Sequence, residues 1–191
     1  MATFGMKYAV FAKIATEPAT TAPTYSTGVV IGKAMDAEIK ANFNEASLYG
    51  DDAPAEYVKE LKDVDVTLGV TTIPGEAATA LFGSTLTAKT DNAGEKVSYK
   101  DTDTASYGGL GFIARESIDN VVGYMLVWLP KVKFAPSDNK FQTKGDSITF
   151  QNESISGKAV RCNSGEWKNI EHYSTEAAAI AALNTKAGIT E

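Results

Sequence analysis

Apolar and polar residues alternate in two segments of the first half of the chain, at 36–44 and 63–70. A period of two is the pattern of a β-strand with one buried face and one face in solvent. The two segments therefore predict a long hairpin with an apolar face in a core. The inward positions are Ala37, Ile39, Ala41, Phe43, Val64, Val66, Leu68 and Val70.

The connection between these segments, EASLYGDDAPAEYVKE at 45–60, is too long for a tight turn. Gly50, two aspartates and Pro54 mark a break inside it. We predict an extended or partly ordered hairpin loop.

Further apolar runs predict additional strands. Residues 121–129 are apolar on both faces, which is typical of a central strand, and Pro130 is expected at its end or at a bulge. Shorter strands are predicted at 6–12, 29–31, 96–99, 111–115, 148–150 and 155–161.

Two short helices complete the pattern. Pro74 suits the first turn of a helix that Gly83 ends. Near the C-terminus, Ser174 or Thr175 caps a helix with Glu176 in its first turn, and Gly188 ends it. Many short strands and two helices predict a mainly β (α+β) fold, a sandwich or barrel with helices at its side.

We expect a single domain over 1–191, with an N-terminal arm at about 1–28, the hairpin loop at about 45–60 and the C-terminal helix at about 174–187. The arm contains the proline- and threonine-rich stretch Ala15–Thr27. We predict that this stretch has too little apolar surface to pack by itself.

Composition narrows the class of protein. Of the 191 residues, 43% are hydrophobic, and the formal net charge is −6. No apolar run is long enough to span a bilayer, and lysines interrupt the N-terminal stretch where a signal peptide would lie. The single cysteine, Cys162, forms no intrachain disulfide, so we expect folding in a cytoplasm.

Charge is distributed unevenly along the chain. Residues 36–65 carry nine acids and three lysines, whereas residues 121–170 carry seven bases and four acids. Either these charges are dispersed over a solvated surface, or an acidic face and a basic face meet in an assembly.

Candidate chemistry is weak. The stretch 28–34 is one residue short of a phosphate-binding loop, and 109–114 matches a dinucleotide fingerprint but leads into a strand. His172 is the only histidine in the sequence. We expect Cys162 to be a small buried apolar residue and not a nucleophile. We therefore expect no enzyme, no catalytic residue, no cofactor and no metal site.

Three segments resemble the major tail proteins of the phi13 type, the tail tube subunits of long-tailed phages. They are LYGDD at 48–52, WLPKVKF at 128–134 and TKGDSITFQ at 143–151, in the order of that family. The resemblance covers roughly residues 30–185 and implies two packed antiparallel sheets with a flanking helix. It also implies a structural virion protein that forms stacked hexameric rings around a lumen.

The resemblance implies further partners. A tape-measure protein fills the lumen first, genomic DNA passes through it without specific binding, and tail terminator and distal tail or baseplate proteins cover the ends. The expected location is the virion tail, assembled in the host cytoplasm. Alternatives are another tail, baseplate or head–tail joining protein with the same fold, or a carbohydrate-binding β-sandwich that stacks sugars on Trp128 or Trp167.

We predict two sets of residues with a role in assembly, one at the lumen and one at contacts between subunits. Strand geometry places the polar residues of the hairpin opposite to its core face, where we expect the lumen: Asp36, Glu38, Lys40, Asp63, Asp65 and Thr67. Contacts between subunits or rings are expected from the hairpin loop and from basic groups that pair with it: Tyr49, Asp51, Asp52, Glu56, Lys131, Lys133 and Lys144.

Overall fold

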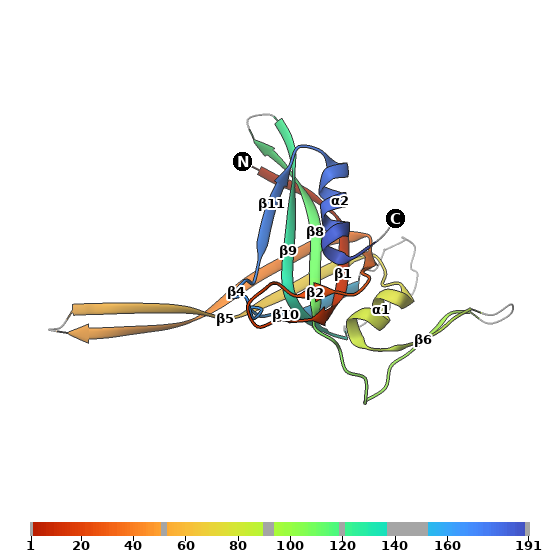
Figure 1. The fold of residues 1–191 in the computed structure, drawn as a ribbon, viewed down its shortest axis with the longest axis horizontal. Helices are drawn as coiled ribbons and strands as arrows, with labels where there is room; N and C mark the ends of the chain where they lie inside the picture. Colours follow the sequence, from red (N-terminus) through yellow and green to blue (C-terminus); the bar gives the residue numbers. More distant parts are fainter. Residues whose placement is uncertain (1, 51–52, 90–93, 119–120, 137–152, 190–191) are drawn as a thin grey trace, which may run out of the picture.

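The computed structural model describes residues 2–50, 53–89, 94–118, 121–136 and 153–189 (Figure 1). Within these ranges the chain forms strands and two helices, in this order: β1 (Ala2–Thr16), β2 (Thr24–Tyr25), β3 (Val29–Gly32), β4 (Ala34–Gly50), β5 (Ala53–Val70), α1 (Gly75–Phe82), β6 (Thr85–Thr87), β7 (Lys96–Ser98), β8 (Gly108–Ile118), β9 (Val121–Ala135), β10 (Glu153–Ala159), β11 (Asn169–Tyr173) and α2 (Glu176–Ala187).

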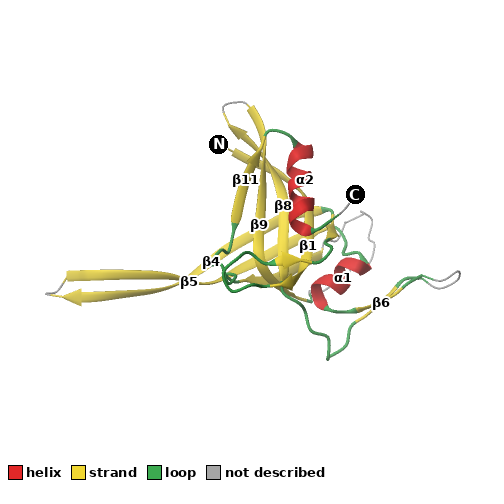
Figure 2. Ribbon diagram, in the orientation of Figure 1, coloured by secondary structure: helices red, strands yellow, loops and turns green. Residues whose placement is uncertain are grey.

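Most of the strands belong to one antiparallel sheet (Figure 2). Its order is β2-β1-β8-β9-β10-β5-β4, with β3 also paired to β1 and β11 also paired to β9. β6 and β7 form a second, two-stranded sheet. The predicted fold class, mainly β with antiparallel sheets, a short helix and a C-terminal helix, is confirmed.

The large sheet bends at β9. The first half of β9 pairs with β11 and its second half with β10, so β10, β5 and β4 turn away from the plane of β1 and β8. The inner faces of both halves share one core, in which Phe11 of β1 meets Phe134 of β9 edge to face at 5.9 Å. The two packed layers are therefore two halves of one sheet.

The helices lie where the sequence placed them. α1 follows Pro74, ends at Gly83 with a left-handed φ of 77°, and buries Leu81 against the core of the sandwich. The Oγ1 atom of Thr175 accepts a hydrogen bond from the backbone N–H of Ala178 and so caps α2.

α2 covers the opposite face of the sheet. Its buried Ala179, Leu183 and Ala187 pack against Trp128 of β9 and Val10 of β1. Both faces of β8 and β9 are therefore covered, one by the sandwich core and one by α2. This arrangement explains why 126–129 is apolar on both faces, whereas Val121 and Val122 at the start of β9 are exposed.

Pro130 lies inside β9, at a bulge. Gly108 pairs with Val132 and Leu110 with Leu129, so two steps along β8 face three steps along β9. Proline has no backbone N–H to donate to the ladder, and a bulge tolerates this gap. A bulge is one of the two positions that the sequence predicts for Pro130.

The N-terminal strand is longer than predicted. β1 runs over Ala2–Thr16 and pairs with β8 through most of its length. The predicted strand at 6–12 is too short, and the arm expected at about 1–28 is wrong for residues 2–16. Gly5 and Tyr8 have positive φ angles of 66° and 57° beside two register shifts, which interrupt the alternation of apolar residues.

The proline- and threonine-rich stretch packs on its own subunit. Glu17 accepts a hydrogen bond of 2.6 Å from Lys131, and the ring of Tyr25 lies edge to face on Trp128 at 5.1 Å. The hydroxyl of Tyr25 donates to the carbonyl oxygen of Pro130 at 2.8 Å. The prediction that Ala15–Thr27 cannot pack by itself is therefore wrong, because one aromatic ring and one ion pair anchor it.

Candidate assembly surfaces

β4 and β5 extend beyond the body of the protein as a two-stranded ribbon (Figure 1, left). The two strands pair from Ala34 opposite Val70 to Gly50 opposite Ala53, with register shifts after Ala34, after Asn42 and after Leu48. The loop expected at 45–60 is thus a pair of antiparallel strands over its described residues, 45–50 and 53–60. Of the residues expected to break the strands, Gly50 ends β4 and Pro54 lies inside β5, whereas Asp51 and Asp52 lie outside the described residues. The polar residues on either side concealed the two strands.

Apolar side chains lie exposed on the ribbon. Leu48 is 64% exposed and Tyr49 69%, and Tyr57 and Val58 are also exposed. Phe43, expected in the core, is exposed as well, because the ribbon has already left the body at that position. Monomeric proteins seldom present apolar residues on an isolated pair of strands, so the ribbon has the character of an interaction surface.

The ribbon is braced across its two strands. The Nζ atom of Lys59 lies 2.6 Å from Oε1 of Glu45 and 4.5 Å from the centre of the Phe43 ring. The hydrogen bond from Lys59 lowers the pKa of the Glu45 carboxyl. Cross-strand contacts of this kind contribute modestly to the pairing of the two strands.

The residues expected at subunit contacts do not lie together. Tyr49 and Glu56 are exposed on the ribbon. Lys131 instead pairs with Glu17 of its own chain, and Lys133 lies on the outer face of the sheet beside Tyr107. The pairing of these lysines with the ribbon of a neighbouring subunit or ring stays a prediction. Three residues of the set, Asp51, Asp52 and Lys144, lie outside the described residues.

The residues expected at the lumen share one face of the sheet. Glu38 lies opposite Thr67 and Lys40 opposite Asp65, while Val66 and Leu68 of the same strand are buried on the other face. The full set on this outer face is Asp36, Glu38, Lys40, Asp63, Asp65 and Thr67.

The outer face is less acidic than the sequence suggested. β10 and β9 continue it, and cross-strand pairing places Lys158 opposite Asp65 and Lys133 opposite Lys158. Lys40, Asp65, Lys158 and Lys133 thus form one row across four strands. Lys158 is not among the residues expected at the lumen, although its alternation with the buried Ile155 and Ala159 marks it as outward.

A hydrogen-bonded cluster holds two of the acids, and its single lysine offsets one of their two negative charges. The Nδ2 atom of Asn42 lies 2.7 Å from Oδ1 of Asp63 and 2.7 Å from Oδ2 of Asp65. Lys158 lies 3.3 Å and 3.0 Å from the same two carboxylates. The hydrogen bonds from Asn42, followed by those from Lys158, lower the pKa of both aspartates, and Asp65 in turn raises the pKa of Lys158.

The weak motifs of the sequence belong to strands. Gly32, with a φ of 114°, is a kink at the end of β3, and 109–114 lies within β8. His172 is half exposed, with Nδ1 2.6 Å from Oε1 of the buried Glu116, and Cys162 is buried. Within the described ranges, no three His, Cys, Asp or Glu side chains are grouped as metal ligands. The helices of those ranges are too short or too polar to cross a membrane.

Comparison of the chain with models of known protein families and with curated proteins gives no match. The surfaces described above therefore carry the functional argument.

Proposed function

We propose that this protein is a tail tube subunit, which assembles into stacked hexameric rings through which a phage delivers its DNA. The observation that carries the proposal is the ribbon of β4 and β5, which exposes Leu48, Tyr49, Tyr57 and Val58 away from the body. A surface of this kind needs a protein partner. LYGDD, WLPKVKF and TKGDSITFQ resemble segments of phi13-type tail proteins. This resemblance is the reason for proposing hexameric rings that stack into a tube.

The edge of the sheet supports self-assembly. β4 is the last strand of the sheet, and no described strand pairs with its outer edge. A long unpaired edge is a template for another chain, and joining neighbouring sheets into a closed barrel removes it. In that arrangement the outer face of β4, β5, β10 and β9 lines the lumen.

The outer face suits the passage of DNA. Its acids are Asp36, Glu38, Asp63 and Asp65, and its lysines are Lys40, Lys133 and Lys158. Because Lys158 is held by two aspartates, few free cations remain to replace the counterions of a phosphate backbone. The duplex is then not retained on the wall.

The proposed partners are further copies of the chain, a tape-measure protein in the lumen, and terminator and distal tail proteins at the ends of the tube. The proposed location is the virion tail, after assembly in the host cytoplasm. A carbohydrate-binding function has less support, since Trp128 is buried under α2 and Trp167 is half buried against the core.

Electron microscopy of the purified protein tests the proposal. We expect rings or tubes with sixfold symmetry, and light scattering is expected to give particles much larger than 20.3 kDa. A monomer at every concentration and salt condition would refute the tail tube function. Rings of sixfold symmetry that never stack would favour a baseplate or head–tail joining protein.

A further inference from the structure

A groove separates β1 from β4. No strand pairing within the described ranges joins these two strands, although both border the same core. The groove has a volume of about 430 Å³, and its lining is mainly apolar. Its lining includes Met6 of β1, Ala37 and Ile39 of β4, Phe112 of β8, Met125 of β9 and Ile170 of β11.

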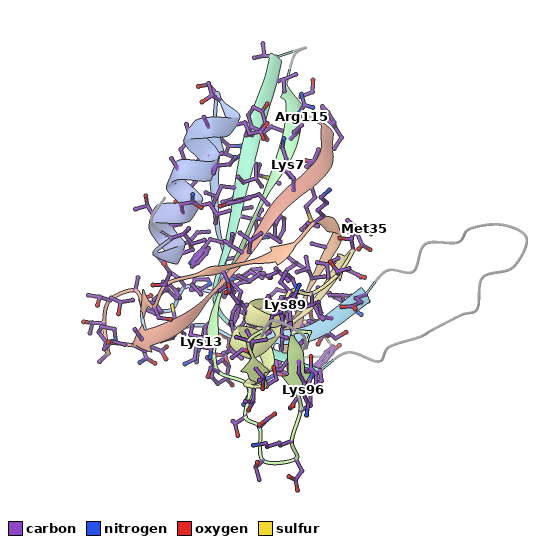
Figure 3. The ribbon with its side chains drawn as sticks, turned by 90° about the vertical axis from the view of Figure 1, so that its right-hand side faces the viewer. Lys7, Lys13, Met35, Lys89, Lys96 and Arg115 are labelled. Carbon is purple, nitrogen blue, oxygen red and sulfur yellow. The ribbon has the colours of Figure 1, made fainter. Side chains whose placement is uncertain are left out.

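The border of the groove is basic. Lys168 lies on its lining beside Ile170, and Lys33 lines a second hollow, toward β3. Lys7 also lines that second hollow, but its amino group pairs with Glu176 of α2. Figure 3 shows this side of the molecule, with Lys7 on β1 and Met35 on β4 labelled. None of the residues that line the two hollows is acidic. The groove therefore fits a partner that carries both apolar groups and carboxylates.

The ribbon has that composition. Residues 44–60 contain five acids and one lysine. Leu48, Tyr49 and Val58 are exposed there, and Glu56 lies among them on the same part of the ribbon. In both charge and apolar character, the ribbon complements the groove.

A chain cannot place its own ribbon in its own groove. Ile39 in the groove and Tyr49 near the ribbon end belong to the same strand, β4. Ten residues of strand separate them by roughly 33 Å, and the paired ribbon runs straight away from the body. The occupant must therefore come from a second copy.

We propose that the β1–β4 groove receives the acidic and apolar end of the ribbon from a second copy of this chain, with Lys168 facing a ribbon carboxylate. This proposal rests on the proposed function and names the contact that joins successive subunits. The two surfaces differ, so every copy both inserts a ribbon and receives one. A head-to-tail contact of this type propagates without limit unless it closes into a ring.

Cross-linking tests the contact directly. In a Cys162→Ser background, a Leu48→Cys chain is mixed with an Ile170→Cys chain, assembled, and treated with a short bismaleimide. We expect a cross-linked dimer. The matched control replaces Ile170→Cys by Lys158→Cys, a position on the outer face of the sheet, and should give none. A dimer with Lys158→Cys but not with Ile170→Cys overturns the proposal.

Charge exchange gives a second readout. We expect Lys168→Glu to raise the concentration needed for assembly about tenfold, because the ribbon carboxylates then face a like charge. Adding Glu56→Lys in the same chain should restore assembly, whereas Lys100→Glu, outside the groove, should have no effect. Failure of Lys168→Glu to alter assembly overturns the groove contact.

The outcomes separate the two proposals. If the unaltered chain forms tubes but Leu48→Cys and Ile170→Cys do not cross-link, only the groove contact is wrong. If the two positions cross-link in assemblies that are not tubes, the contact stands and the tail tube function is wrong.

Discussion

The amino group of Lys158 lies 3.0 Å from Oδ1 of Asp65, on the face of the sheet that points away from the core. The two residues belong to the neighbouring strands β10 and β5 and are direct cross-strand partners. With Asn42 and Asp63 beside it, this pair leaves one net negative charge where the hairpin alone presents two carboxylates. The electrostatics of the proposed lumen depend on that pairing.

The cluster predicts a dependence of stability on pH. The pKa values of Asp63 and Asp65 are lowered in the folded protein, so their contribution to stability is present above the ordinary range of an aspartate and is lost as the pH falls through their folded pKa values. We expect Asp63→Asn with Asp65→Asn to lower the melting temperature at pH 7. The difference from the unaltered protein should shrink toward pH 3 in thermal unfolding followed by circular dichroism. A difference that grows in acid contradicts the assignment.

Reversal of the same charges tests the lumen. Asp63→Lys with Asp65→Lys leaves Lys158 without its partners and completes a row of cations from Lys40 through position 65 and Lys158 to Lys133. We expect tubes to assemble and DNA ejection from virions to slow, because the new lysines replace counterions of the phosphates, and their release into solution favours binding of the DNA to the wall. Glu95→Lys with Asp101→Lys, away from this face, is the control. Ejection at the normal rate would exclude an electrostatic role for the lumen wall.

Local patterns predicted the parts of the fold in which neighbours in sequence determine the structure. The alternation around Ile39 and Val66 identified the base of the hairpin, and Thr175 and Gly188 marked the ends of α2. The ribbon could not be recognised in this way, because its strands pair with each other and not with a core, so no apolar face forms.

Contacts between distant segments could not be predicted. Nothing near Asp65 in sequence points to Lys158, and nothing near Glu17 points to Lys131, since each pair is set by the order of strands in the sheet. For the same reason, the set of lumen residues predicted from the hairpin did not include Lys133 of β9 and Lys158 of β10, which lie on the same face.

Tyr25 is predicted to anchor the loop that follows β1. Tyr25→Phe keeps the ring on Trp128 but leaves the carbonyl oxygen of Pro130 without its donor. We expect a loss of about 1 kcal/mol in the free energy of unfolding, measured by urea denaturation. Tyr107→Phe, at a more exposed tyrosine, is the control, and equal losses in both variants would contradict the role of Tyr25.

The hydroxyl of Tyr25 is expected to lose its proton at a higher pH than an ordinary tyrosine. Burial raises the pKa of Tyr25 to about 12. Between the ordinary tyrosine pKa near 10 and that value, the unfolded chain loses the proton while the folded chain keeps it, so stability falls as the pH rises. Ultraviolet titration of the unaltered protein and of Tyr25→Phe should differ by one phenolate only at the upper end. A difference already present at pH 10 would show that Tyr25 is exposed.

The ribbon is predicted to be needed for assembly and not for folding. Its exposed residues make no contact with either core cluster, and Ala46 and Val58 are partners in the ladder. Replacing 47–57 by Asn-Gly closes the ladder with a favourable two-residue turn. We expect the melting temperature to change little and tubes to disappear in electron micrographs.

The matched variant Leu48→Ser with Tyr49→Ser keeps the full ribbon and removes only apolar groups. It should also weaken assembly, because apolar burial is the main source of affinity at such a contact. Normal tubes from the shortened chain would mean that the rings are joined by another surface, and a large fall in melting temperature would mean that the ribbon stabilises the body on which it is built.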